Sequence, residues 1–285
     1  MPDNNIAQDT GWRRFELPDS SRVNAIMKRL GEISKEHPEI VLKPGIFDYD
    51  KTPPEVQAEI DELFKELEDL HIEEVIWKIG IYYSYLQNNL SEIDVSLAEY
   101  LLTELENGTY FIPDEIIKDI LNRFPKLKEK HPKIQEILNA PFIIDEDKRE
   151  FFFLDIHDDE LQPLYSEIEN LAKAGVRGII FERKAGFVHI NYESAHPELK
   201  KVLDEIAEKI TRKLFEIMVY DTAYYYYLMI EKPSLLKRGN ANAVLFIKSE
   251  CIPVPNVVVV DALNRFPELR NKYPEITKEY KKFLK

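Results

Sequence analysis

A phrase of sixteen residues occurs twice in this chain, and this repetition limits how the chain can fold. The phrase reads DILNRFPKLKEKHPKI from Asp119 and DALNRFPELRNKYPEI from Asp261. It lies within a gapless match of Pro113–Ile134 to Pro255–Ile276 that has eleven identities in twenty-two positions, where chance would give roughly one or two. A match of this length indicates a repeated structural unit, so both occurrences should adopt the same secondary structure.

Two shorter blocks repeat in the same order along the chain. The tyrosine-rich block IYYSYL matches AYYYYL at the same offset, and PEVQAEIDEL at Pro54 matches PELKKVLDEI at Pro197 with a shift of one residue. The sequence therefore predicts a tandem duplication of one unit of roughly 130–140 residues. The first copy is expected over residues 12–141 and the second over residues 149–285.

Comparison of the two copies assigns segments that are ambiguous when read alone. NVVVVDAL is rich in β-branched residues, but its counterpart DEIIKDIL places its apolar residues on one helical stripe, so both segments are predicted to be helices. SLAEYLLTELENG is predicted to be a helix with a capping box of Ser96 and Glu99 and an end at Gly108. Its counterpart NANAVLFIKSE is assigned a helix by the same comparison.

The remaining segments complete the predicted unit. An amphipathic helix at 23–35 or 161–174 precedes a short extended segment, and the alternation around Lys184 in the second copy predicts a β-hairpin. Pro54 and Pro197 are expected to start helices, because a helix leaves its first N–H groups unpaired and proline has none. The tyrosine blocks are expected to form the next helix. The predicted fold class is α+β, mainly helical, with helices plus a short β-hairpin in each unit.

Composition excludes several classes of protein. The chain of 285 residues is 44% hydrophobic, and it shows neither a signal-peptide pattern nor eighteen consecutive apolar residues. We therefore expect a soluble, cytoplasmic protein that does not contact a membrane. Cys251 is the only cysteine, which excludes a disulfide framework and a zinc site of several thiolates. No cofactor or metal is predicted, and the net charge of −14 argues against direct binding of nucleic acid.

The excess negative charge is concentrated in the first copy. Residues 1–141 carry a net charge of −12 and residues 142–285 a net charge of −2. Much of the excess follows Pro54, where acidic residues flank an apolar stripe. The stripe consists of Val56, Ile60, Leu63, Phe64, Leu67 and Leu70. An acidic run of this kind is either a solvated face or a docking surface for a basic protein. The residues predicted to bind the partner are Glu55, Glu59, Glu62, Glu66, Asp69, Glu73, Tyr82, Tyr83 and Tyr85.

The tyrosine blocks are too broad to face a single core. Four consecutive residues, Tyr224 to Tyr227, sweep about 400° of a helix. They are expected either to pack between the copies with their hydroxyls hydrogen-bonded or to form a surface for a partner or for self-assembly.

The repeated phrase itself has two interpretations. Asp119 and Arg123 have the i, i+4 spacing of a helical ion pair, as do their counterparts in the second copy. In the structural interpretation, Phe124 and Phe266 are buried at equivalent helix corners. In the functional alternative, the phrase forms a site built twice from Asp, Asn and Arg.

One cluster could carry catalysis. The chain has no glycine-rich nucleotide loop, no G-x-S-x-G and no H-E-x-x-H. His157, Asp158 and Asp159 could bind a divalent metal, and Glu182 beside Lys184 could add a carboxylate and a positive charge. The structural alternative is that acids at 158–160 favour a helix N-terminus and that Glu182 lies on a solvated hairpin.

Binding is therefore the predicted function. We expect an acidic inhibitor, immunity-type protein or adaptor that docks on a basic protein, possibly one that acts on nucleic acid, and we do not expect an enzyme. Two alternatives remain, a metal-dependent hydrolase or nuclease using the cluster above and a self-assembling structural protein. The sequence leaves open the partner, the oligomeric state and the surface that the tyrosines form.

Overall fold

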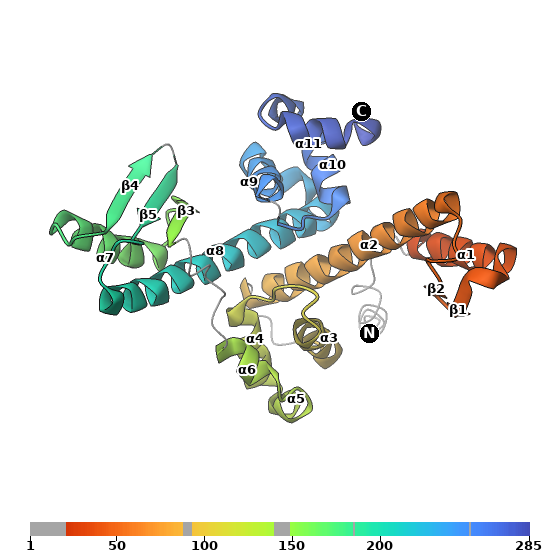
Figure 1. Cartoon of the computed structure of the whole chain (residues 1–285), viewed down its shortest axis with the longest axis horizontal. Coiled ribbons are helices and arrows are strands. Elements are labelled where there is room, and N and C mark those ends of the chain that lie inside the picture. Colours follow the sequence, from red (N-terminus) through yellow and green to blue (C-terminus); the bar gives the residue numbers. More distant parts are fainter. Residues whose placement is uncertain (1–20, 88–92, 140–148, 185, 251) are drawn as a thin grey trace, which may run out of the picture. The chain divides into compact units, whose positions relative to one another are not determined.

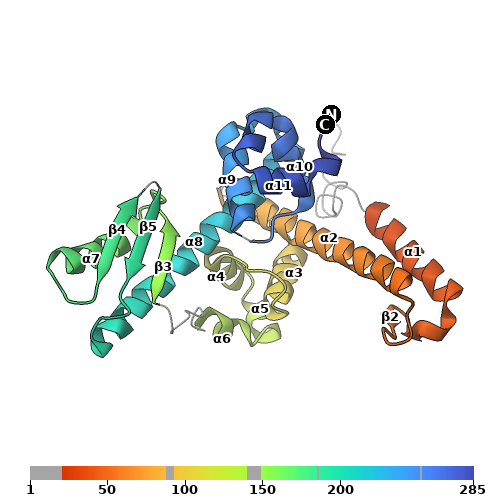
Figure 2. The ribbon, with the colours of Figure 1, turned by 45° about the horizontal axis from the view of Figure 1, so that its top comes forward.

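The chain is mainly helical and carries two small antiparallel sheets (Figures 1 and 2). This architecture confirms the predicted α+β, mainly helical class. The computed structural model describes residues 21–87, 93–139, 149–184, 186–250 and 252–285. None of the described helices combines the length and the apolar character needed to cross a bilayer.

The described elements are as follows. The helices are α1 (Ser21–Glu36), α2 (Pro54–Gln87), α3 (Val95–Glu106), α4 (Asp114–Arg123), α5 (Pro125–Lys130), α6 (Ile134–Asn139), α7 (Leu161–Lys173), α8 (Pro197–Glu231), α9 (Arg238–Ser249), α10 (Asn256–Arg265) and α11 (Pro274–Glu279). The strands are β1 (Val41–Lys43), β2 (Ile46–Phe47), β3 (Glu150–Leu154), β4 (Ile180–Lys184) and β5 (Phe187–Asn191).

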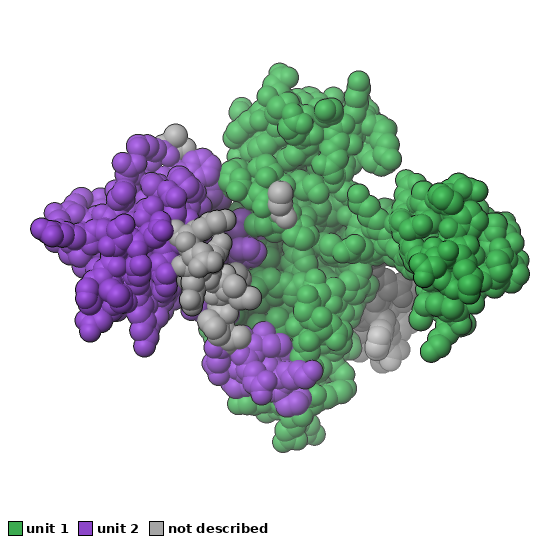
Figure 3. All heavy atoms as spheres, viewed as in Figure 1, with its two compact units in different colours: residues 1–131, 219–285 green, residues 132–218 purple. Residues whose placement is uncertain are grey.

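These elements divide into two compact units (Figure 3). Unit 1 contains the described residues up to His131 and those from Val219 onwards, and unit 2 contains Pro132–Met218. Helix α8 therefore supplies residues to both units. A division by packing does not test the predicted copies over 12–141 and 149–285, so the duplication stays a prediction.

Most predicted helix positions are confirmed. Helices α1 and α7 occupy the segments predicted as amphipathic, and α2 and α8 begin at Pro54 and Pro197. The β-branched segment NVVVVDAL lies within α10 and is helical, as its counterpart in α4 indicated. The predicted hairpin of the second copy is also present, as β4 and β5 pair in antiparallel register.

Two details of the helix prediction were wrong. The tyrosine blocks do not form separate helices, because α2 and α8 continue without interruption for 34 and 35 residues. Helix α3 is capped by Asp94, whose carboxylate accepts a hydrogen bond from the Ser96 N–H at 2.8 Å, and Ser96 does not form the predicted capping box. A carboxylate at the N-cap satisfies an N–H group that the helix leaves unpaired.

The repeated NRFP segments form equivalent corners, but their phenylalanines are not buried. Phe124 has φ −123° and ψ 69°, and Phe266 has φ −128° and ψ 69°, so both residues leave the preceding helix in the same way. Both rings are only partly buried, and the fully buried residues at these corners are Leu127 and Leu269. The predicted burial of the phenylalanines was wrong because the proline after each one turns the chain, which places the residue three positions later in the core.

The first half of α2 builds a small core with α1 and the first hairpin. Ile26, Leu30 and Ile33 of α1 pack with Val56 and Ile60 of α2. Ile40 and Phe47, next to and within the β1–β2 hairpin, join the same cluster. The predicted apolar stripe of α2 therefore faces α1, and the two helices lie side by side in both ribbon views (Figures 1 and 2).

The second half of α2 crosses α8 within unit 1. All residues from Val75 to Tyr82 are buried, which is expected only for a helix covered on most sides. At the crossing, a Cβ atom added to Gly80 would lie 2.7 Å from the carbonyl oxygen of Ala223. The two backbones can approach this closely only because residue 80 has no side chain.

This contact gives the first prediction. Changing Gly80 to Ala should lower the free energy of unfolding by about 1–3 kcal/mol, because the added methyl group forces the helices apart. Gly31 in α1 is the matched control, since a Cβ atom there would meet no atom within 4 Å. Gly31→Ala should leave stability unchanged or raise it by up to about 1 kcal/mol. Urea denaturation of both variants tests this, and equal stability of the two variants would contradict the close crossing.

Unit 2 is built on a three-stranded antiparallel sheet of order β3-β5-β4. Val188 and Ile190 of the central strand are buried, and so are Tyr165 and Ile168 of α7. Helix α7 packs beside β4 on this side of the sheet. The opposite face carries more exposed side chains, among them Phe152, which is 67% exposed and stacks on the ring of His189.

Candidate functional site

The acidic residues predicted to bind a partner share one face of α2. Their spacing of three and four residues places them in a single row along the helix. The row consists of Glu55, Glu59, Glu62, Glu66, Asp69 and Glu73. Two arginines of α1, Arg22 and Arg29, lie against this row.

These arginines bind two of the glutamates. Arg29 donates from Nε to Glu59 Oε1 at 2.6 Å and from a terminal nitrogen to Glu59 Oε2 at 3.1 Å. Arg22 donates to Glu66 Oε1 at 3.3 Å. The hydrogen bond from Arg29 lowers the pKa of Glu59. Glu59 and Glu66 therefore hold α1 against α2, and 42% of each side chain stays exposed.

Asp69 and Glu73 also make contacts within unit 1. The Asp69 carboxylate accepts a hydrogen bond from the backbone N–H of Asn256 at 3.2 Å, at the start of α10. Burial raises the pKa of Asp69. Glu73 is buried, and it accepts a hydrogen bond from the hydroxyl of Tyr226 at 2.7 Å and pairs with Arg22 at 3.5 Å.

Glu55 and Glu62 are the members of the row that stay exposed. Neither forms an ion pair with another residue in the described part of the chain. The nearby β1–β2 hairpin exposes two apolar side chains, as Leu42 is 60% and Ile46 is 52% exposed. Glu55, Glu62, Leu42 and Ile46 are named here the acidic hairpin surface.

Tyr82 was predicted to contact a partner, but its hydroxyl is used inside the fold. Tyr82 is buried and donates a hydrogen bond to Asp119 Oδ2 at 2.8 Å, and Asp119 pairs with Arg123 at 2.6 Å. Burial and this hydrogen bond raise the pKa of the tyrosine well above its ordinary value. The predicted ion pair of the repeated phrase is present, and it orients an acceptor for a buried hydroxyl.

The second occurrence of the phrase makes the same set of contacts. Tyr225 donates to Asp261 Oδ2 at 2.8 Å, and Asp261 pairs with Arg265 at 2.8 Å. Tyr82 therefore corresponds to Tyr225, 143 positions later. The sequence alignment had placed the tyrosine blocks at an offset of 142, whereas these two contacts follow the offset of 143 found between Pro54 and Pro197.

The aromatic contacts at the crossing show the same offset. Tyr83 stacks on Tyr220 with ring centroids 4.2 Å apart, and Tyr226 packs on Trp77 at 5.4 Å. Trp77 of α2 and Tyr220 of α8 are 143 positions apart, and so are Tyr83 of α2 and Tyr226 of α8. The two aromatic pairs therefore consist of corresponding residues, with the roles of α2 and α8 interchanged. The closest contact, Gly80 with Ala223, obeys the same rule. Contacts that reciprocate in this way are those of an approximate two-fold arrangement.

The paired hydroxyl contacts give the second prediction. Tyr82→Phe and Tyr225→Phe should each lower the free energy of unfolding by about 1–3 kcal/mol, because each leaves a partly buried carboxylate without one of its donors. Tyr224→Phe is the control, since that side chain is 41% exposed. Chemical denaturation should show similar losses for the first two variants and almost none for the third. A loss confined to one of the two would show that the contacts are not equivalent.

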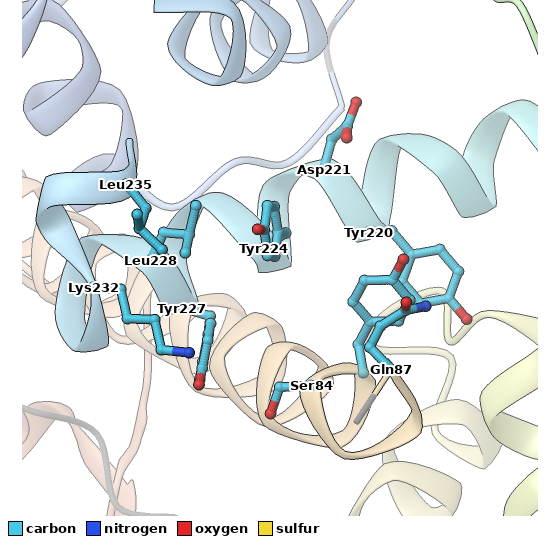
Figure 4. A pocket seen from close by; sticks show the side chains of 10 residues that line it. Ser84, Gln87, Tyr220, Asp221, Tyr224, Tyr227, Leu228, Lys232 and Leu235 are labelled. Carbon is cyan, nitrogen blue, oxygen red and sulfur yellow. The ribbon is translucent and has the colours of Figure 1, made fainter. Parts of the chain in front are cut away.

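A cavity of about 420 Å³ opens beside the crossing (Figure 4). It is named here the tyrosine pocket. It is lined by Tyr83, Ser84, Gln87, Tyr220, Asp221, Tyr224, Tyr227, Leu228, Lys232 and Leu235. Its volume is in the range of small-molecule sites. Tyr220 and Asp221 lie at one end of the pocket and Lys232 and Leu235 at the other.

Asp221 is the unusual group of this pocket. Its side chain makes no hydrogen bond or ion pair with any residue that the structure describes, and reduced hydration raises its pKa from 3.8 to about 6. The residue keeps an exposed surface, so solvent moderates the effect. Tyr85, the remaining tyrosine predicted to bind a partner, is half-buried on α2 and does not line the pocket.

The pKa of Asp221 gives the third prediction. Its folded-state pKa is above its unfolded value, so the folded chain binds more protons between about pH 4 and pH 6 and loses stability as pH rises through this range. Asp221→Asn should therefore raise the melting temperature at pH 7.5 and change it much less at pH 4. Thermal unfolding at several pH values measures this. A difference that does not depend on pH would contradict the perturbed carboxyl.

The alternative site in the repeated phrase has no free carboxylate to offer. Asp119 and Asp261 are each engaged by a tyrosine and an arginine. The Asn264 side-chain oxygen accepts hydrogen bonds from Arg270 at 3.0 Å and from the backbone N–H of Lys285 at 2.8 Å. The phrase therefore supports the corner, as the structural interpretation held.

The proposed metal cluster is not assembled. Asp158 Oδ1 accepts hydrogen bonds from the N–H groups of Glu160 and Leu161 at 2.9 and 3.1 Å, at the start of α7. His157 and Asp159 are exposed, and Glu182 pairs with Lys184 on the hairpin. Within the described ranges, no three His, Cys, Asp or Glu side chains are placed to hold a metal ion. Cys251 lies outside those ranges.

Sequence reasoning did not find the tyrosine pocket. Its residues come from the last turns of α2, from the C-terminal third of α8 and from the residues just after α8, so no local pattern joins them. One signal was available in the segment YDTAYYYY, where Asp221 is the only charged residue in a block of aromatic and small side chains. A lone acid in such a block is a candidate for a perturbed functional group.

Searches against protein-family models, curated proteins and solved structures return no match to this chain. The argument for function therefore rests on the chemistry of the surfaces described above.

Proposed function

We propose that the chain is an acidic protein-binding module, of the inhibitor, immunity-protein or adaptor type, whose partner is a basic protein. The observation that carries the proposal is the acidic hairpin surface, where Glu55 and Glu62 remain exposed although Glu59 and Glu66 are bound by arginines. The exposed carboxylates provide charge for a partner without weakening the contact between α1 and α2.

Apolar side chains on the same part of unit 1 support the proposal. Leu42 and Ile46 are more than half exposed on the β1–β2 hairpin. Protein interfaces combine apolar anchors with a charged and polar rim. Exposed aliphatic residues on this hairpin and exposed carboxylates on α2 fit a partner that offers both a hydrophobic contact and positive charge.

The charge distribution indicates the chemistry of that partner. Residues 1–141 have a net charge of −12, and a field of this sign speeds the approach of a basic protein and repels nucleic acid. Enzymes that act on nucleic acid carry basic surfaces, so a cytoplasmic enzyme of that type is the partner class we propose.

The proposed tandem duplication has support from the contacts in unit 1. The Tyr82–Asp119–Arg123 and Tyr225–Asp261–Arg265 sets match. The reciprocal contacts at the α2–α8 crossing follow the offset of 143 residues that separates Tyr82 from Tyr225, whereas the Asp and Arg residues of the two sets are 142 positions apart. Two copies of one unit that pack across an approximate two-fold axis would give both observations.

The two alternative functions have less support. The hydrolase hypothesis needs a metal cluster, and its four residues are instead divided between the start of α7 and the hairpin. The self-assembly hypothesis needs exposed tyrosines. Tyr82, Tyr225 and Tyr226 are buried, and Tyr224 is the exposed member of its block at 41%.

The fourth prediction tests the binding function. The full chain is used to capture partners from its source cells, and the purified partner is then measured against variants. Glu55→Lys combined with Glu62→Lys should reduce the association rate at least roughly tenfold at low salt, because charge steers the encounter. The melting temperature should hardly change, because exposed substitutions of this kind cost little. Binding of the unmodified chain should weaken with added salt.

The matched control reverses charge on α8. Lys201 and Lys209 are exposed, and Lys201→Glu combined with Lys209→Glu should change the association rate less than about twofold. If both double variants bind a basic partner equally well, the acidic hairpin surface is a solvated face and the proposed mechanism is wrong.

A further inference from the structure

The three-stranded sheet of unit 2 has an incomplete counterpart in unit 1. In unit 2, strand β3 pairs with one side of β5 and β4 pairs with the other side. In unit 1, β1 pairs with one side of β2, and no strand in the described ranges pairs with the other side. An unpaired strand edge presents N–H and C=O groups that favour pairing with a further strand. The open side of β2 is therefore a docking site for such a strand.

A tyrosine and an aspartate identify the same position beside both sheets. In unit 2, Tyr192 donates to Asp204 Oδ1 at 2.9 Å, and Asp204 Oδ1 also accepts from Arg149 Nε at 3.1 Å. In unit 1, Tyr49 donates to Asp61 Oδ1 at 2.9 Å, and both residues lie 143 positions before their counterparts. Asp61 is exposed and forms no ion pair with any residue that the structure describes. The unit 1 set therefore lacks its arginine.

The tyrosine of unit 1 also lacks the cover that β3 gives in unit 2. Tyr192 is fully buried, and the Phe151 ring of β3 stacks on it with the ring centroids 5.9 Å apart. Tyr49 is 41% exposed. Strand β3 follows directly on Arg149, so one short segment supplies both the arginine and the aromatic ring. A segment that fits the open side of β2 should offer an arginine and, two positions later, an aromatic residue.

The chain contains such a segment before α1. Residues 13–17 read RRFEL, and they lie outside the described ranges. Within this segment an arginine and two apolar residues occupy alternate positions, as they do in and just before β3. The matching residues are Arg13, Phe15 and Leu17 in the segment and Arg149, Phe151 and Phe153 at β3. Alternate residues of a strand share one face, so all three side chains of the segment can meet the same surface.

The position of this segment in the chain also matches that of β3. Arg13 lies thirteen residues before Ile26, and Arg149 lies twelve residues before Leu161. Ile26 and Leu161 are the first buried residues of α1 and α7, and the later buried residues of both helices follow at the same spacings of four and three. The connection to the helix therefore has nearly the same length in both cases.

We propose that residues 13–17 of this chain dock on the open side of β2 as a third strand, in the register that β3 has on β5. Arg13 then pairs with Asp61, and the Phe15 ring covers Tyr49. The occupant is this segment and not a strand of another chain, because the short connection to α1 keeps it near the edge at a high effective concentration.

The docked strand has two effects on unit 1. It closes an edge that otherwise favours pairing with other chains, and it gives Asp61 the counter-charge that Asp204 has in unit 2. A partner of the acidic hairpin surface then meets side chains and not free backbone groups. The proposal does not rest on the proposed binding function, because all of its contacts lie within one chain.

The hydrogen bonds of β3 show which residues of the segment should bond to β2. The Tyr192 N–H donates to the Arg149 carbonyl at 3.1 Å, and the Asp155 N–H donates to the Gly186 carbonyl at 2.9 Å. Between these two bonds, successive residues of an antiparallel strand alternate between bonding the partner strand and facing away from it. Residues 15 and 17 should therefore bond to β2, and residues 14 and 16 should not.

Amide hydrogen exchange of the full chain, resolved by NMR, tests this pairing. The amides of Phe15 and Leu17 should exchange at least about 100-fold more slowly than those of Arg14 and Glu16, because only the first two donate to β2. A period of two in the protection is specific to a strand with one open edge. Rapid exchange of all four amides would overturn the proposal.

Single substitutions show which arginine holds the strand. Arg13→Ala and Asp61→Asn should each reduce the protection at least about tenfold, and the combined variant should reduce it little further, because both changes break one ion pair. Arg14→Ala is the matched control, and it should leave the protection unchanged because Arg14 lies on the other face of the strand. Equal effects of Arg13→Ala and Arg14→Ala would overturn the assigned contact. Far-UV circular dichroism confirms that the variants fold.

Sedimentation velocity of the same samples identifies the source of the strand. The protection should be the same at all concentrations at which the chain is a monomer. Protection that appears only as dimers form would give the strand to a second copy and would overturn the docking within one chain. No partner is present in these experiments, so a failure of the proposed binding function leaves their outcome unchanged.

Discussion

Four buried tyrosine hydroxyls in the described part of the chain find their acceptor in the same way. In each case the hydroxyl donates to a carboxylate that also pairs with an arginine. The sets are Tyr82–Asp119–Arg123, Tyr225–Asp261–Arg265, Tyr226–Glu73–Arg22 and Tyr192–Asp204–Arg149. The arginine orients the carboxylate, so the hydroxyl enters the core with a hydrogen-bond acceptor. Three of these sets tie α2 or α8 to other elements of unit 1.

This chemistry explains why the repeated phrase and the tyrosine blocks occur together. The phrase provides the Asp and Arg, and the long helix provides the hydroxyl, so neither segment can be buried alone without an unsatisfied group. The acidic row on α2 is subject to the same requirement. Arginines of α1 and the Tyr226 hydroxyl bind Glu59, Glu66 and Glu73, which leaves Glu55 and Glu62 for solvent or for a partner.

Local patterns in the sequence predicted the features that depend only on residues close together in the chain. Helix periodicity, proline at Pro54 and Pro197, and the i, i+4 spacing of Asp119 and Arg123 all correspond to features of the fold. Features set by distant residues were not predictable in this way. The packing of separate helices determines which residue accepts the Tyr82 hydrogen bond, and it determines that Phe124 stays partly exposed. The tyrosine pocket depends on the same packing. Charge counting also failed to show that α1 neutralises part of the acidic row, because Arg22 and Arg29 lie thirty or more positions away from Glu59, Glu66 and Glu73 in the sequence.

The contact between Gly80 and Ala223 also has a consequence for synthesis of the chain. The two residues are 143 positions apart, and ribosomes add about 5–20 residues per second. The faces of Trp77 and Gly80 that α8 covers therefore wait roughly 7–30 s for that helix to emerge. During this interval the nascent first half presents an apolar helix face with no intramolecular cover, which is the period in which chaperones or a neighbouring nascent chain could bind it.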